Sequence, residues 1–288
     1  MNPVSTLSSA YLTVGNSVNQ NFNSMLNSIA RLSTGQRINR AADDPAGLLA
    51  AEAVKSQITT REALLRSSRQ TSALIDVADG ALSEASRLTN TIRGNLITAA
   101  SSTTSDAERA ALQLEIDGAI DAFNRLGDVT YNGRPVFSGE KLNVNYSPDL
   151  NTSSELYLPT LDAETYGGED GVLADLRTGG QYDLESGDLA SALKALDGVQ
   201  SQLIYNRAEY AAFDKYSQDS IYQSLEDQQI ELQSIYSELM DANFVSETAE
   251  LTRSAILAQS SLTAYKSLVA VAKTQESMLD ALFDLNRR

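Results

Sequence analysis

The feature that most constrains this chain is a row of apolar residues near its start, spaced at intervals of three and four. This spacing places one narrow apolar stripe along an α-helix and is typical of a coiled coil. The residues between are mostly Asn, Ser, Gln and Thr, and no charged side chain precedes Arg31. Uncharged flanks favour burial among other chains, although an amphipathic helix on a globular core is an alternative. The row consists of Leu7, Tyr11, Val14, Val18, Phe22, Met25, Ile29 and Leu32.

The C-terminal end carries a second row of the same kind. Its residues step by sevens, fours and threes, which again predicts a long helix with one apolar stripe. Two such helices can cover each other's stripe, so we expect them to pair and to bring the chain ends together. The second row consists of Leu257, Ala264, Leu268, Val271, Met278 and Leu282.

The stretch "RLSTGQRINRAADDPAGLLAAEAV", residues 31–54, interrupts the helical pattern. Gly35 is suited to end the first helix, because glycine adopts the left-handed conformation of a C-terminal cap without strain. Asp44 has the position of an N-cap and Pro45 that of the first helical residue, while Asp43 adds negative charge at the positive end of the helix dipole. A tight polar connector is therefore predicted. Its connector and cap residues are Gly35, Arg37, Asn39, Asp43, Asp44 and Pro45.

Two adjacent aspartates could also indicate a metal site. Calcium takes about six to eight oxygen ligands, and no further hard-oxygen ligands cluster near Asp43 and Asp44. Because helix capping already accounts for both carboxylates, we predict no metal site here.

The rest of the chain predicts further long helices. Helical spacing continues from about residue 45 to 100, and a last long helical region begins near Asp188. Between them, Ser105 and Glu108 form a capping box that opens a helix, and Gly127 is placed to end it.

The middle of the chain differs from its helical flanks. "YNGRPVFSG" contains an Asn-Gly turn, and "KLNVNYS" and "SELYLPTL" alternate apolar and polar residues like two short strands. The Gly- and acid-rich stretch that follows, residues 163–188, indicates a surface loop or small insert. We therefore predict a mainly α protein in which long antiparallel helices form a terminal coiled coil and a helical rod, with a small β-hairpin insert.

Composition excludes several functional classes. The chain has no histidine, no cysteine and a formal net charge of −16. The usual zinc sites, cysteine nucleophiles and Ser-His-Asp triads cannot be built, and the negative charge disfavours nucleic acid and anionic membranes as partners. No apolar run approaches the ~20 residues that span a bilayer, and the first residues do not resemble a secretory signal. We predict no catalytic residue, no cofactor, no nucleic-acid partner and no membrane insertion.

Two stretches carry a resemblance to a known family. "LNSIARLSTGQRINRAADDPAGLLAAEAVKSQI" resembles the N-terminal signature of bacterial flagellins, and "ANFVSETAELTRSAILAQSS" resembles their C-terminal signature. The resemblance implies an inner coiled coil, a helical rod and a variable part that is minimal here. The expected divisions are 1–34 with 253–288 for the inner terminal coiled coil, 35–44 for the connector, 45–137 with 188–252 for the rod, and 138–187 for the hairpin and variable insert.

The resemblance also implies a function. Flagellins are structural subunits that polymerise into the extracellular flagellar filament for motility, and they leave the cell through the flagellum's own channel. The implied partners are further copies of the chain, an export chaperone, and the cap and junction proteins. One departure is a helical stretch between Asn206 and Asp241 that looks about three turns too long, either through an insertion or because the predicted register is wrong.

Other functions remain open. "YNGRPVFSG" resembles the hook–filament junction protein of the same superfamily, whereas "SETAELTRSAILAQSS" resembles flagellin proper. A soluble coiled-coil adaptor is a more distant alternative. Soluble coiled coils usually carry charged residues at the positions that flank the apolar stripe, whereas the flanks of the N-terminal stripe here carry no charge before Arg31. Some flagellins contain an inserted zinc peptidase, but a chain without histidine does not fit that class.

The resemblance further implies a patch that the vertebrate innate receptor for flagellin recognises. The matching stretch is "NTIRGNLI", in which Arg93 is kept while Thr91 and Gly94 replace charged residues of the family's patch. Glu115 on the next helix also matches a contact position. The patch is therefore half kept, and simple packing positions in the rod are the alternative explanation.

Overall fold

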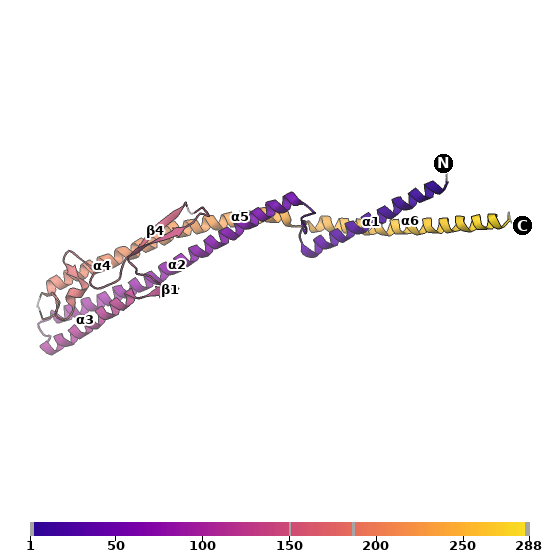
Figure 1. The fold of residues 1–288 in the computed structure, drawn as a ribbon. Helices are drawn as coiled ribbons and strands as arrows, with labels where there is room; N and C mark the ends of the chain where they lie inside the picture. Colours follow the sequence, from indigo (N-terminus) through magenta and orange to yellow (C-terminus); the bar gives the residue numbers. More distant parts are fainter. Residues whose placement is uncertain (1–2, 150, 186–187, 286–288) are drawn as a thin grey trace. The chain divides into compact units, whose positions relative to one another are not determined.

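A computed structural model describes residues 3–149, 151–185 and 188–285. The chain divides into two compact units, Met1–Gln57 with Glu231–Arg288 and Ile58–Ile230. The mainly α fold predicted from the sequence is confirmed, whereas its finer division into coil, connector, rod and insert stays a prediction. The long helices are α1 (Pro3–Thr34), α2 (Pro45–Ala99), α3 (Asp106–Gly127), α4 (Leu189–Ala212), α5 (Asp219–Met240) and α6 (Phe244–Leu285), as Figure 1 shows.

Helices α1 and α6 lie side by side in the first unit and run antiparallel (Figure 1). The hydroxyl of Tyr11 donates to the carbonyl of Leu268 at 2.8 Å near one end of the pair. At the other end, Arg31 lies 3.1 Å from Glu247. The expected pairing of the terminal helices is therefore present.

The second unit holds the main hydrophobic core, between α2, α3 and α4. Local sequence chemistry explains where α3 begins, because the amide of Ser105 donates to Glu108 at 2.8 Å and the amide of Glu108 donates to the serine oxygen at 3.3 Å. Gly127 is the last residue of α3, but it does not adopt the expected left-handed conformation; glycine is required there because an added Cβ would collide with the carbonyl of Leu161. Fully buried core residues include Leu82, Ile92, Ile116, Ile120, Phe123, Leu196, Val199 and Leu203.

Short antiparallel strands cover part of this core. The pair β1 (Thr130–Tyr131) and β2 (Arg134–Pro135) turns at Asn132 and Gly133, whose φ angles of 51° and 76° require the residues found there. The hairpin of β3 (Glu140–Asn145) and β4 (Ser153–Leu158) forms where strands were predicted.

The stretch predicted as a surface loop or small insert contributes several buried side chains to the core, although many of its other residues are exposed. It contains the short strands β5 (Gly167–Gly168) and β6 (Gly171–Val172) and the 3₁₀ helix η1 (Leu173–Leu176). Apolar residues spaced irregularly through a glycine-rich sequence carry no helix or strand period, so their burial was not predicted. The buried residues of this segment are Ala163, Tyr166, Leu173, Leu176 and Leu184.

A six-residue π-helix, η2 (Phe213–Gln218), joins α4 to α5. Phe213 and Gln218 are both buried although they lie five positions apart, because a π-turn holds more residues than an α-turn. Gln218 accepts a hydrogen bond from Ser68 on α2 and donates one to the Tyr146 hydroxyl, each at 2.9 Å. A change of helical register therefore lies within the stretch that looked too long.

Candidate interaction site at the paired terminal helices

Helix α1 contacts α6 through a row that overlaps the predicted one. Tyr11, Val14, Val18, Met25 and Leu32 are partly buried on this row. The contact row keeps a strict spacing of three and four residues, so it passes through Asn21 and Ser28 where the predicted row had Phe22 and Ile29. Phe22 and Ile29 are largely exposed. Leu7 lies outside the residues whose side chains are described.

On α6 the contact row differs from the predicted row. Ser254 and Ala258 are buried against α1 and Leu268 is partly buried, while Leu257, Ala264, Val271 and Met278 are exposed. Helix α6 carries small or apolar residues around much of its circumference, so spacing alone does not single out one row. Small serine and alanine side chains also let two helices approach closely. Leu282 lies outside the residues whose side chains are described.

Polar contacts accompany the helix pair along its length. Tyr11 donates its hydroxyl to Leu268, and its ring also packs edge to face against the ring of Tyr265, with the two centroids 6.0 Å apart. Arg31 is the one charged residue in the sequence of α1, and it reaches Glu247, whose side chain is 13% exposed. The second carboxylate oxygen of Glu247 is buried and has no hydrogen-bond partner among the described residues. This ion pair joins the end of α1 to the start of α6.

The connector begins and ends with two local caps. Gly35 has a φ of 71°, a conformation that favours glycine, and it follows the last residue of α1. Asp44 Oδ1 accepts a hydrogen bond from the Gly47 amide at 2.9 Å, and Pro45 is the first residue of α2. The break between α1 and α2 therefore has its own local stabilisation.

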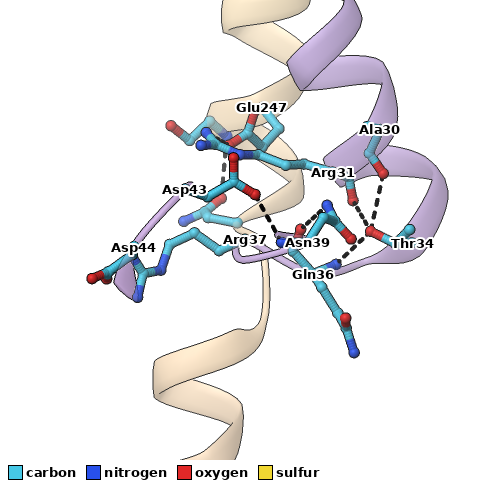
Figure 2. A network of polar contacts seen from close by, with 11 residues as sticks. Ala30, Arg31, Thr34, Gln36, Arg37, Asn39, Asp43, Asp44 and Glu247 are labelled. Carbon is cyan, nitrogen blue, oxygen red and sulfur yellow. Dashed lines mark hydrogen bonds and ion pairs between the residues drawn. The ribbon is translucent and has the colours of Figure 1, made fainter. Parts of the chain in front are cut away.

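Asp43 makes hydrogen bonds within the connector that the sequence did not predict, and its expected interaction with the dipole of α2 stays a prediction. Its Oδ2 accepts the amides of Asn39 at 3.0 Å and Arg40 at 2.9 Å, and Figure 2 labels Asn39 and Asp43 in this loop. Hydrogen bonds from the backbone of Arg40 and then of Asn39 lower the pKa of Asp43 below its ordinary value. The two donated amides therefore stabilise the Asp43 carboxylate and, with it, the conformation of the connector.

The connector also pairs with the break between α5 and α6, which the sequence did not predict. The Arg37 amide donates to the Met240 carbonyl at 2.6 Å, and the Ala242 amide donates to the Gly35 carbonyl at 2.8 Å. Gln36 and Asp241 lie opposite each other as an antiparallel bridge. We call residues 35–44 and 240–243 together the crossing.

The crossing has a small apolar core and a second capped helix start. Ile38, Ala51 and Met240 are buried together, with Leu48 and Tyr236 among the residues packed against them. Asn243 accepts the amides of Val245 and Ser246, each at 3.1 Å, at the start of α6. The sequence "DAN" before an apolar run was the available signal for this second break.

The residues of the expected receptor patch take part in contacts within the second unit. Arg93 on α2 forms an ion pair with Asp197 on α4. Glu115 on α3 accepts a hydrogen bond from Asn95 on α2 at 3.1 Å. Thr91 is exposed, and an added Cβ at Gly94 would meet open space. Both charged residues therefore join helices of the unit, and their role toward a receptor stays a prediction.

Within the described part of the chain, no three carboxylate, histidine or cysteine side chains gather closely enough to hold a metal ion. No described helix is long and apolar enough to cross a membrane.

The fold and the site define a class of mainly helical proteins in which the two terminal helices pair and keep exposed apolar rows. Residues 4–141 match the family described as the bacterial flagellin N-terminal helical region. Relatives named as a flagellar filament core protein and as a flagellin match along most of its length, so the chain is similar to bacterial flagellins.

Three curated relatives illustrate this similarity. Flagellin A of Helicobacter pylori is 28% identical over 62% of this chain and 34% of its own length. A flagellar filament 30.7 kDa core protein of Treponema maltophilum is 27% identical over 86% of this chain and 88% of its own. A flagellin of Halalkalibacterium halodurans is 25% identical over 84% and 86%. The chain spans about a third of the length of the first relatives it matches.

A likeness among solved structures concerns the fold alone. A protein from Vibrio parahaemolyticus described as flagellar hook-associated superposes with a TM-score of 0.61 at 10% identity, over 69% of this chain and all of that one. At this identity the match does not distinguish a flagellin from a junction protein, and it does not indicate which partners this chain binds.

Proposed function

We propose that this chain is a structural subunit that polymerises into the bacterial flagellar filament, outside the cell, and serves motility without catalysing a reaction. The similarity to bacterial flagellins, which are structural proteins, supports this proposal. So does one observation on the terminal helices, which keep exposed apolar rows after they have paired with each other.

The exposed row of α1 is large and uncharged. Leu12 is 68% exposed and Leu26 is 55% exposed, and Phe22 and Ile29 lie beside them on the outer side of the helix. Monomeric soluble proteins rarely expose contiguous apolar patches of this kind unless the patch binds a partner.

The exposed row of α6 is similar. Val245 is 81% exposed and Ile256 is 61% exposed, and the row continues through Leu257, Val271 and Met278. A shallow hollow lies over its first turns, between Phe244 and Leu257. Burial of apolar area contributes roughly 25 cal/mol per Å², so several such side chains per subunit favour association.

We propose that further copies of the chain bind to these exposed rows. A row without charges can pack against itself in many copies without repulsion, although the whole chain carries a net charge of −16. The finer partners implied by the family are a chaperone that holds α6 before export, the filament cap and the junction proteins.

Substitution of the exposed row tests the proposal. Leu26→Lys should abolish filaments in seeded samples viewed by electron microscopy, while the circular dichroism of the monomer stays that of the unmodified chain. Asn19→Lys places the same charge at an exposed polar position of α1 and should leave polymerisation intact. Filaments of normal length from Leu26→Lys would contradict the proposal.

Counting copies distinguishes the junction alternative. A filament subunit is present in thousands of copies along each filament, whereas a junction protein forms about one ring. Immunogold labelling of this chain along isolated flagella should therefore decorate the whole filament. Label confined to one end would favour the junction protein.

A further inference from the structure

One arginine side chain links the ends of two helices at the crossing. Arg37 Nη2 donates to the carbonyl of Leu239 at 2.8 Å, in the last turn of α5. Arg37 Nη1 lies 3.4 Å from Asp44 Oδ2, on the residue that caps α2. A cation is favoured at a helix C-terminus and an anion at an N-terminus, so this guanidinium serves both ends at once.

The backbone joins the same two breaks. The amide of Arg37 donates to Met240 at 2.6 Å, and the amide of Ala242 donates to Gly35 at 2.8 Å. Each break thus satisfies polar groups that the other leaves without a helical partner. Ile38 lies with Met240 in the same small core, so apolar packing also closes across the crossing.

We infer that the two breaks of the crossing behave as one coupled hinge, and that Arg37 is the positioning residue that couples them. Opening the connector removes the acceptor of the Ala242 amide, and opening the other break removes the acceptors of the Arg37 amide and guanidinium. The α1–α2 and α5–α6 connections therefore change conformation together. This inference concerns the soluble chain and does not depend on filament assembly.

Hydrogen exchange of the full-length monomer, resolved by residue, tests the coupling. In Arg37→Met, the amides of Arg40 in the connector and Ala242 in the other break should exchange at least tenfold faster and by the same factor. The amide of Val136, bonded to Val129 in the second unit, should keep its rate. Arg253→Met is the matched control, because Arg253 is an exposed arginine of α6 that lies 3.9 Å from Glu250, ten or more positions along the chain from the crossing.

Gly35→Ala provides a second perturbation from the opposite side. Alanine is strained at a φ of 71°, and Gly35 contributes no side chain to either helix end. The same two amides should again accelerate together. Faster exchange at one break with unchanged exchange at the other, in either variant, would overturn the inference. Should Arg37→Met unfold the chain, the Gly35→Ala result decides.

Discussion

Replacing two glycines of α2 by alanine should change stability in opposite directions. In a helix, Gly→Ala normally stabilises by about 0.8–1 kcal/mol because alanine loses less backbone entropy. Gly80 is exposed and an added Cβ there meets nothing within 4 Å, so Gly80→Ala should show this full gain. Gly47 stands in the first turn, where an added Cβ would lie 2.8 Å from Cγ of Asp44 and 2.9 Å from Cδ1 of Ile38.

The cost at Gly47 can be estimated from those two contacts. Asp44 must rotate away and lose its cap, which costs about 0.5–2 kcal/mol. Ile38 is buried in the core of the crossing, and overpacking such a site costs about 1–3 kcal/mol. Against a gain of at most about 1 kcal/mol, Gly47→Ala should destabilise by roughly 0.5–4 kcal/mol.

Thermal unfolding followed by circular dichroism at the helical band measures both variants. We expect the midpoint of the unit that holds the substitution to rise by about 2–4 °C in Gly80→Ala and to fall by several degrees in Gly47→Ala. An equal rise in both variants would show that the capped start of α2 is more tolerant than its geometry indicates, and would refute the argument.

Three further predictions concern assembly, receptor recognition and pH. Deletion of residues 1–32 or 254–288 should leave a soluble helical fragment, and sedimentation under seeding conditions should find no polymer from either. The monomer should signal weakly through the vertebrate flagellin receptor in a cell reporter assay, because charged partners are missing at Thr91 and Gly94. The double variant Thr91→Arg, Gly94→Glu should restore part of the signal. Strong signalling by the unmodified chain would contradict this prediction. Because the folded-state pKa of Asp43 is lowered, its stabilisation of the connector should be present above about pH 4 and be lost as the pH falls through the folded-state pKa, which a carboxyl NMR titration compared with Asp43→Asn can follow.

Features set by neighbouring residues were predictable from the sequence. The capping box at Ser105, the turn at Asn132 and the start of α2 after Asp44 depend on groups within a few positions of one another. Each has a distinctive residue at a fixed spacing, so the pattern predicts the geometry.

Features set by distant residues were not predictable in the same way. The hydrogen bond between Gly35 and Ala242 joins segments more than two hundred positions apart, and no residue pattern in either segment indicates that it pairs with the other. The row of α6 that contacts α1 differs from the predicted row, because the small alanines and serines of this helix pack as well as its larger residues. The burial of Tyr166 and Leu173 depends on a loop fold that has no period.

The π-helical segment η2 also determines where this chain can lose a residue during evolution. Deleting one exposed residue of the segment, such as Tyr216, would bring Phe213 and Gln218 four positions apart, which is α-helical spacing for one face. The buried rows on both sides would keep their direction. The same deletion within α4 would turn every later side chain of the helix by about 100° and expose the row around Leu225. Shorter homologous sequences should therefore place their gap within residues 213–218, where a length difference leaves the core unchanged.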